Sequence, residues 1–539
     1  MRNIWLIPIC LLLTAACGKQ AETPTVLVGI DGAEWQIINQ MIGDGELPNF
    51  ARIKNEGAWG HLINNGMETS PVVWTTFATG HFAREHGVLD HVFPFGDEGA
   101  RRPVTSELRQ VPALWNIADH YGLRSTVIGY FVSHPPEPIN GVMVSSQAPT
   151  WIEGSIYPPD AIDLDSRRYQ ALLNEDVRKR IWSTYFGWDV DRAQADDPDS
   201  PYQSAAAAVV ERSLDRRIIR DEFLRRATED LSKQPTDLFI TYYRIPDIVS
   251  HSLWKYYDPD VYENPPTAEE LAWFGESVKQ TYRFVDRALG ELLEAWDGQA
   301  NMVIVSDHGF GRASARKMNS EFKRVEFLTG DHRPDGVIMA HGPDIQPGQI
   351  EGLTIMEIAP TMAALLGLPV AGNLPGQIAT NLIRPEFFES QPLKSVADYS
   401  DVVLPNREIV LDQVVQEDEM NTLKGLGYVG EGVEFDVSSV AEGYDFWGAR
   451  DRLVASHMSS EIVYFLLQHS DHLAQESFDL LKVNRPDLEL RTLAVTEQKF
   501  DLLAQRLPPG AMDPVPFEAF FEANPRPKRN HQPDLESDQ

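Results

Sequence analysis

Carboxylate and imidazole side chains follow short apolar runs at three separate places in the chain. Asp31 comes directly after "TVLVGI", Asp307 and His308 follow "MVIVS", and Asp247 and His251 come shortly after "DLFITYY". A charged group at the end of a buried run is costly unless water, an opposite charge or a metal ion compensates it. Carboxylate and imidazole ligands together suit zinc, with manganese or iron as alternatives. The pattern therefore predicts a metal centre.

The spacing within each pair is compatible with a shared ion. Asp247 and His251 are four residues apart, so on a helical turn they lie on the same face. Asp307 and His308 are adjacent and would point to opposite faces of a strand, but in the loop after it they can converge. Either pair alone also fits a solvated turn. The metal interpretation rests on their joint occurrence after separate apolar runs.

The elements that must position these residues alternate between strands and helices. "VPALWNIADHYGLRSTVIGY" predicts a helix that stops at Gly122 and a strand after it, and "IMEIAPTMAALLGLP" predicts a helix that ends at Gly367. One long helix is expected from Thr267 to Trp296, with Thr267 and Glu270 at capping-box spacing. This order predicts an α/β fold with a mostly parallel central sheet and helices on both faces. The carboxyl ends of parallel strands form one crevice, where such sheets bind ligands.

The sheet is expected to belong to a catalytic domain that carries two further regions. A catalytic domain spans residues 25–405, and residues 151–235 interrupt its alternation as an inserted cap. Residues 406–539 read as an acidic, helical extension that ends in a polar tail, which we expect to be disordered.

The N-terminus predicts export. Residues 1–17 contain a basic residue, a short apolar stretch and small residues before Cys17, as in a secretory signal peptide. "LTAAC" resembles a bacterial lipobox, so we expect lipidation of Cys17 and a periplasmic, membrane-anchored protein; ordinary signal cleavage is the alternative. The only other cysteine, Cys10, lies inside the signal, so no intrachain disulfide is expected.

The acidic composition limits the partners that we expect. The formal net charge is −33, from 47 Lys and Arg against 80 Asp and Glu. A surface of this sign repels nucleic acid, so no binding to nucleic acid is expected. A bound metal would supply the local positive charge for an anionic substrate. The oligomeric state is left open.

Five stretches together resemble the alkaline phosphatase superfamily, in its type I phosphodiesterase and nucleotide pyrophosphatase branch, over about residues 25–385. They are "VGIDG", "ETSPVVWTTFATGHFAREHGVLDH", "PDIVSH", "VSDHGFG" and "HRPDG". The resemblance implies two divalent metal ions, which we expect to be zinc. Asp31, Asp307 and His308 would hold one ion, and Asp247, His251 and a third histidine would hold the other.

The resemblance also implies a serine or threonine nucleophile that binds metal, at Ser70, with Thr69 as the alternative register. His332 and His341 are the candidates for the third histidine of the second ion. We favour His332, because acidic neighbours in "GDHRPDG" could orient its ring and relatives carry a histidine in a similar segment.

The expected function is metal-dependent hydrolysis of a small phosphate ester, a diester or a monoester, by in-line attack of Ser70 through a phosphoseryl intermediate. A phosphoethanolamine or other phosphoryl transferase is the alternative, although such enzymes commonly carry several transmembrane helices, which the sequence does not predict. A sulfatase is disfavoured because the segment at Ser70 lacks the x-P-x-R motif. A lipid-anchored binding protein with a dead site is disfavoured because the ligand set is retained.

Overall fold

The structure is a computed structural model of the chain. It describes residues 21–65, 69–95, 100–186, 215–262, 264–313 and 329–405, together with isolated residues between 457 and 481. The expected signal peptide and Cys17 lie outside the described residues.

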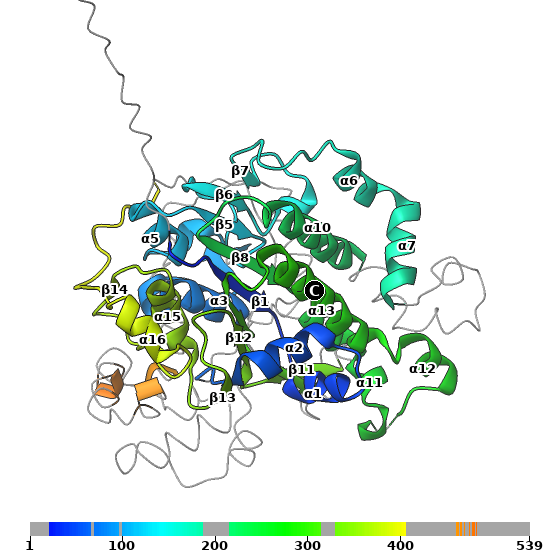
Figure 1. The fold of residues 1–539 in the computed structure, drawn as a ribbon. Coiled ribbons are helices and arrows are strands. Elements are labelled where there is room, and N and C mark those ends of the chain that lie inside the picture. The colour runs from blue at the N-terminus through cyan, green and yellow to red at the C-terminus, as the bar shows by residue number, and fades with distance from the viewer. Residues whose placement is uncertain are drawn as a thin grey trace, which may run out of the picture.

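A nine-stranded mixed sheet forms the centre of the fold (Figure 1), in the order β13-β2-β12-β9-β1-β8-β5-β6-β7. Five neighbouring strands are parallel to one another: β9 (Asn301–Val305), β1 (Thr25–Ile30), β8 (Leu238–Tyr243), β5 (Ser125–Ile128) and β6 (Gly141–Val144). β12 (Gly336–His341) is antiparallel to both β9 and β2 (Ala58–Leu62). β13 (Gly348–Ile350) is parallel to β2, and β7 (Ile156–Tyr157) closes the other edge antiparallel to β6.

Helices cover both faces of this sheet (Figure 1). The residues of β1 alternate between two apolar cores, with Val26 and Val28 in one and Leu27 in the other. The first core contains α1 (Trp35–Gly43), α2 (Pro48–Glu56), α10 (Asp215–Leu231), α11 (Ile245–Tyr257) and α13 (Ser277–Trp296). The second contains α3 (Ser70–Thr79), α5 (Leu114–His120), α15 (Ile358–Leu365) and α16 (Pro385–Ser390). The predicted α/β fold class is therefore confirmed.

Shorter elements complete the described chain. The helices are α4 (Ala83–His86), α6 (Arg167–Gln170), α7 (Glu175–Phe186) and α12 (Ala268–Phe274). The 3-10 turns are η1 (Ser106–Leu108), η2 (Ala148–Thr150), η3 (Ala171–Leu173), η6 (Pro259–Val261) and η8 (Ile355–Glu357). Three two-stranded pairs are formed by β3 (Val92–Phe95) with β4 (Ala100–Pro103), β10 (Gly309–Arg312) with β11 (Gly330–Arg333), and β14 (Val370–Ala371) with β15 (Ser395–Val396).

One segment that was predicted to form a single helix forms two. The segment expected to be a single helix is broken into α12 and α13 between Phe274 and Ser277. Gly275 lies at the break, and glycine is a poor residue for a helix interior. The expected cap at Thr267 is confirmed, since its side chain accepts a hydrogen bond from the Glu270 amide at 3.2 Å. The predicted stop at Gly122 is also confirmed, with a positive φ of 80°.

The region predicted as an inserted cap contains elements of two kinds. α10 packs on β5 and β8 and so covers the sheet, while α6 and α7 lie at the periphery of the molecule (Figure 1).

Most of the predicted C-terminal extension lies outside the described residues. Glu461 belongs to its described part and pairs with Arg84 of α4 at 2.7 Å.

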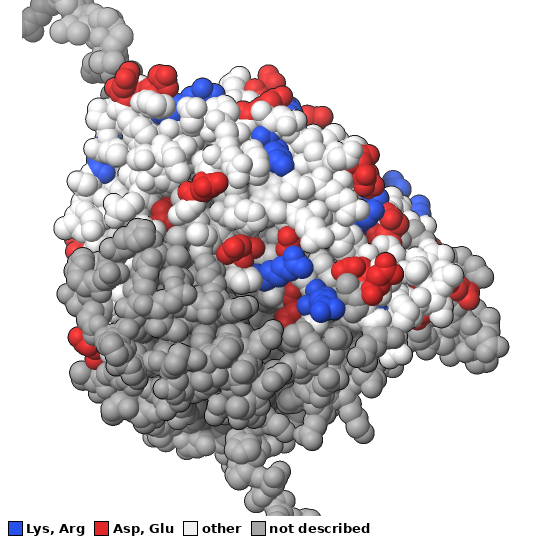
Figure 2. Space-filling view, turned by 90° about the horizontal axis from the view of Figure 1, so that it is seen from below, with Lys and Arg blue, Asp and Glu red and all other residues white. Residues whose placement is uncertain are grey.

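The described surface is mixed in charge. On the face shown in Figure 2, the acidic and basic side chains that the structure describes are interspersed. Within the described ranges, no helix combines the length and the apolar character needed to cross a membrane.

Candidate metal centre

The ends of three parallel strands meet at one edge of the sheet and carry the predicted ligands there. Asp31 follows β1 directly, and Asp307 and His308 follow β9 after one serine. Asp247 lies in the first turn of α11, which starts two residues after β8 ends. The order β9-β1-β8 makes these strands neighbours, so residues far apart in the sequence become adjacent in space.

The first cluster consists of Asp31, Asp307 and His308, whose ligand atoms all lie within 4.8 Å of one another. The Nε2 atom of His308 lies 3.3 Å from Oδ1 of Asp31 and 3.4 Å from Oδ2 of Asp307. All three side chains are buried. The expectation that the adjacent pair Asp307 and His308 converges in the loop after its strand is therefore confirmed.

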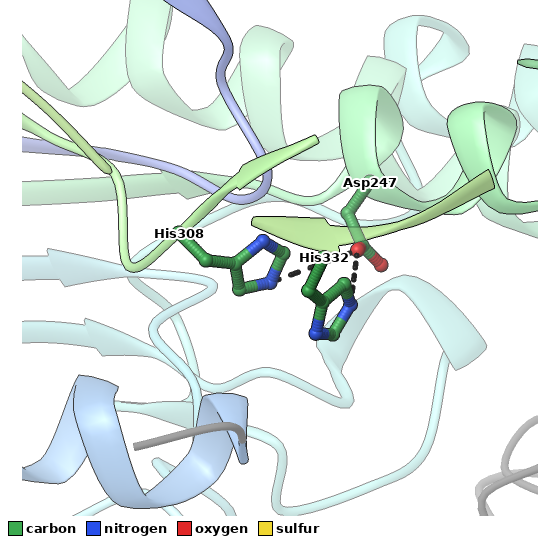
Figure 3. Close-up of side chains that lie close together, drawn as sticks. All are labelled: Asp247, His308 and His332. Carbon is green, nitrogen blue, oxygen red and sulfur yellow. Dashed lines mark ion pairs between the residues drawn. The ribbon is translucent and has the colours of Figure 1, made fainter. Parts of the chain in front are cut away.

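The second cluster gathers around Oδ1 of Asp247 (Figure 3). The Nε2 atoms of His251 and His332 each lie 3.2 Å from it, and Nε2 of His308 lies 3.8 Å from it. The Nε2 atoms of His251 and His332 are 3.0 Å apart, and the rings of His308 and His332 are stacked with centroids 3.6 Å apart. His308 therefore links the two clusters. Asp247 and His251 share a face of α11, as their spacing predicts.

His332 precedes β12 and His341 is its last residue, so the direction of this strand decides which histidine lies at the metal centre. This strand is antiparallel to β9, with Ile338 opposite Val305 and His341 opposite Met302. The residues that precede β12 are therefore at the edge with Asp307, and His341 is at the other edge, where it contacts Glu56 at 3.3 Å. The structure brings His332, and not His341, to Asp247.

Several ligand atoms of the two clusters are buried without a hydrogen-bond partner among the described residues. These are Oδ1 of Asp31, Oδ1 of Asp247, Oδ2 of Asp307 and Nε2 of His308. Their contacts with one another are those of close charges rather than of aligned hydrogen bonds. Buried polar atoms normally have partners, and three carboxylates this close repel one another unless a cation lies between them. The donor set therefore fits divalent metal ions, and its mixture of oxygen and nitrogen suits zinc.

The pKa values of the cluster reflect the same crowding. Burial raises the pKa of Asp307 well above its ordinary value, and the charge of Asp31 raises it further. Burial alone would lower the pKa of His308, but the carboxylates of Asp307, Asp31 and Asp247 raise it to about 10. Burial and the neighbouring His308 lower the pKa of His332 to about 4. A bound cation would reverse the first two effects, because it favours the carboxylate and the neutral imidazole.

Ser70 lies beside the first cluster. It is the first residue of α3, is buried, and lies close enough to Asp307 to oppose the increase in the pKa of that carboxyl. Thr69 precedes the helix as its N-cap residue, and its side chain makes no capping hydrogen bond. The N-terminus of α3 thus carries a hydroxyl at the cluster, and the positive end of the helix dipole lies at the same place.

A further layer of residues orients the predicted ligands, and the sequence reasoning missed it. The Tyr242 hydroxyl donates to Oδ2 of Asp31. Asn64 donates from Nδ2 to the Asp307 carbonyl at 2.9 Å, and Ser306 donates to the His308 carbonyl at 2.7 Å. The only sign in the sequence that Tyr242 could orient a ligand is its position near the end of the strand that precedes Asp247. The sequence contains no such sign for Asn64.

No curated protein matches the sequence significantly. Two solved structures of ectonucleotide pyrophosphatase/phosphodiesterase 5 each cover 67% of this chain and 100% of their own. The murine one, an inactive variant in complex with AMP, is 14% identical with a TM-score of 0.37, and the human one is 14% identical with a TM-score of 0.39. Phosphonoacetate hydrolase from Sinorhizobium meliloti 1021, in complex with phosphonoformate, is 18% identical over 56% of this chain and 60% of its own, with a TM-score of 0.34.

The family model gives the decisive comparison. The model for type I phosphodiesterase/nucleotide pyrophosphatase matches residues 25–359, a range that contains β1, β8, β9 and all the predicted ligands. The chain belongs to this family of phosphoric ester hydrolases, within the alkaline phosphatase superfamily.

Proposed function

We propose that this chain hydrolyses a small phosphate ester with Ser70 as the nucleophile and with two divalent metal ions, which we take to be zinc. The observation that carries the proposal is the position of Ser70. Ser70 is buried, lies close enough to Asp307 to oppose the increase in the pKa of that carboxyl, and stands at the start of α3, next to ligand atoms that have no hydrogen-bond partner among the described residues.

Six side chains would hold the ions in the two sets that the resemblance implies, which are Asp31, Asp307 and His308, and Asp247, His251 and His332. Ser70 would be a seventh metal-binding side chain. When bound, such ions neutralise the crowded carboxylates, activate the nucleophilic oxygen and stabilise the charge that develops during an in-line displacement.

The protein's own residues supply orientation and anion stabilisation. The Ser70 hydroxyl lies beside Asp307, where its oxygen can attack phosphorus opposite the leaving alcohol. The P–O bond to the alcohol breaks as the bond to Ser70 forms, which leaves a phosphoseryl ester. Water then cleaves this ester and restores the hydroxyl. The N-terminal end of α3 favours the negative charge on the transferred phosphoryl group throughout.

The export of the protein is a separate proposal. The apolar leader and the lipobox-like sequence support cleavage before Cys17 and lipidation of that cysteine. Metabolic labelling with a radioactive fatty acid should mark the wild-type protein, and Cys17→Ser should lose the label. A mature protein that starts at another residue and carries no lipid would refute the anchoring but not the export.

A substrate panel tests the proposed function. The purified protein is loaded with zinc and assayed with p-nitrophenyl phosphate, bis-p-nitrophenyl phosphate and p-nitrophenyl sulfate. We expect turnover of a phosphate ester, and mass spectrometry after acid quench should find phosphate on Ser70. Phosphate transfer to an added alcohol instead of water would identify a transferase. Normal activity of Ser70→Ala together with an inactive Thr69→Ala would move the nucleophile by one residue.

A further inference from the structure

The ring of Phe310 lies against the imidazole rings of the second cluster. Phe310 belongs to the stretch "VSDHGFG", and the proposed reaction does not use it. The centre of its ring lies 4.9 Å from that of His251 and 5.7 Å from that of His332, in both cases edge to face. The centre of the His308 ring is 6.2 Å away, with the two planes tilted. Phe310 is fully buried, so it places an apolar group and not water next to these imidazoles.

The backbone of the β10-β11 pair fixes where this ring lies. Phe310 stands directly opposite His332 in the antiparallel register, and side chains that are directly opposite lie on the same face. The Phe310 amide donates to Oε2 of Glu34 at 3.0 Å. Since Glu34 follows Asp31 by three residues, this hydrogen bond attaches the strand that carries the ring to the end of β1.

Two glycines leave the space that the ring occupies. A Cβ atom at Gly330 would lie 2.4 Å from Cε1 of Phe310, and one at Gly32 would lie 3.2 Å from Cδ2. Both distances are shorter than the optimal separation of carbon atoms, about 3.5–4.0 Å, so a side chain at either glycine would push the ring away. Cδ2 and Cε1 are at opposite positions of the ring. Backbone therefore confines the ring at two opposite points.

The ring also joins the two elements that supply imidazoles to the second cluster. His251 lies on α11 and His332 on β11, and α11 packs on both β10 and β11. The Thr329 amide, directly before β11, donates to the His251 carbonyl at 2.8 Å. Trp254 lies three residues after His251 on α11 and packs on Phe310 with ring centres 5.4 Å apart. A shift of the phenyl ring would therefore change the position of His251 relative to His332.

The orientation of these imidazoles matters because both direct the same nitrogen atom at one carboxylate oxygen. Nε2 of His251 and Nε2 of His332 each lie 3.2 Å from Oδ1 of Asp247. An imidazole that turns about its side-chain bonds moves Nε2 away from this point, and an edge-to-face contact with an aromatic ring opposes such a turn. An apolar group beside metal ligands also controls the access of water to them.

We propose that Phe310 is a positioning residue for the second ion. It holds the imidazoles of His251 and His332 with both Nε2 atoms directed at Oδ1 of Asp247, and it keeps water from the side of the site that it covers. It acts through the two histidines and not as a ligand. The inference rests on the proposed function for the metal ions, and it assigns part of the affinity of one ion to a single aromatic side chain.

Zinc affinities of two graded variants test the proposal. Phe310→Ala removes the ring and opens space beside the imidazoles, and Phe310→Leu keeps an apolar side chain without the flat ring. In a competition titration with a chromophoric chelator, the dissociation constant of one zinc equivalent should rise roughly 10- to 100-fold in Phe310→Ala and by a smaller factor in Phe310→Leu. The other equivalent should keep its wild-type value. Wild-type zinc affinities in both variants would overturn the proposal.

His332→Ala identifies which ion is affected. This variant is expected to lose the second ion, so its remaining zinc equivalent reports on the first. Adding Phe310→Leu to His332→Ala should leave the remaining affinity unchanged, because the effect of Phe310 passes through the histidines of the second ion. A further loss of affinity in the double variant would overturn the assignment of Phe310 to the second ion.

Cobalt(II) in place of zinc gives a readout that a general loss of stability does not change. Its visible absorption depends on the number and arrangement of its ligands. At saturating cobalt, the bands of one equivalent should differ between Phe310→Ala and the wild type. If circular dichroism shows that Phe310→Ala is unfolded, Phe310→Leu is measured instead and decides by the same criteria.

Phe284→Ala is the matched control. Phe284 is buried in the same apolar core, and its ring packs on Tyr243 with centroids 6.0 Å apart. This variant should lose stability in urea unfolding and keep both zinc affinities and the cobalt spectrum. The same spectral change in Phe284→Ala, or none in the Phe310 variants, would contradict the positioning role.

These measurements separate the inference from the proposed function because none of them needs turnover. Weaker binding of the second zinc in Phe310→Ala, in a protein whose wild type hydrolyses no ester, would support the role of Phe310 and refute the proposed hydrolysis. Hydrolysis by the wild type together with wild-type zinc affinities in Phe310→Ala would have the opposite meaning, since the proposed function would stand and the inference would fall.

Discussion

Tyr242→Phe should weaken metal binding at the first cluster while it leaves the core packing in place. Tyr242 is fully buried, and its hydroxyl donates to Oδ2 of Asp31, which leaves Oδ1 directed at His308 at 3.3 Å. The ring packs on Trp74 with centroids 4.7 Å apart, and phenylalanine keeps that contact. The substitution therefore removes one hydrogen bond to a charged predicted ligand and little else.

The expected magnitude follows from that single hydrogen bond. A hydrogen bond to a charged group contributes about 1.5–3 kcal/mol, and loss of a partner that orients a metal ligand typically costs roughly 10- to 100-fold in metal affinity. We expect the zinc dissociation constant of one of two ions to rise by a factor in this range. The assay is a competition titration with a chromophoric chelator, which resolves the two equivalents when their affinities differ.

Tyr243→Phe is the control for this measurement. Tyr243 is the next residue of β8, is equally buried, and points to the other face, where its ring contacts Phe284 with centroids 6.0 Å apart. It should leave both zinc affinities at their wild-type values. Equal zinc affinities in Tyr242→Phe and the wild type would refute the view that the Tyr242 hydroxyl orients Asp31 for metal binding.

Three further predictions concern the metals, the third histidine and the pH dependence of stability. A chelator should abolish turnover by the wild type, and added zinc should restore it. Ser70→Ala should stay inactive with zinc present, and its metal content, measured by mass spectrometry, shows whether its metal centre is still formed. His332→Ala should lose one zinc equivalent and most activity, whereas His341→Ala should lose neither; the reverse ranking would move the ligand to His341. Burial raises the pKa of Asp221 from 3.8 to about 6, so the native state binds the proton more tightly than the unfolded state. The wild type should therefore lose stability relative to Asp221→Asn as pH rises from about 4 to about 6, and a constant difference in urea unfolding over that range would contradict this.

Much of the site could be predicted because its residues stand at fixed places relative to strands. Asp31, Asp307 and His308 each come at the end of an apolar run, and the alternation of strands with helices places such ends at one edge. Asp247 and His251 needed only the helical spacing of four. These inferences depend on chain direction and local periodicity, and both can be read from the sequence.

The remaining features depend on strand direction and on contacts between distant segments. Whether His332 or His341 lies at the site is decided by the antiparallel direction of β12, which no local pattern encodes. The break at Gly275 was hidden because the apolar stripe continues on both sides of it. Arg244 is separated by more than a hundred residues from Phe131, so the small cavity that both residues line exists only in the folded chain.

A helix of the region predicted as an insertion, α10, holds the turn between β8 and the metal centre. Asp221 of α10 binds the two backbone amides at the start of α11 and so fixes the turn that carries both Arg244 and Asp247. Arg220, its neighbour on the same helix, lines a small cavity together with Arg244. A change in the packing of α10 on β5 and β8 would therefore displace Asp247 without replacing any predicted metal ligand. Since a misplacement of about 1 Å can cost roughly 100-fold in rate, sequence changes in this helix should alter turnover while the predicted metal ligands stay the same.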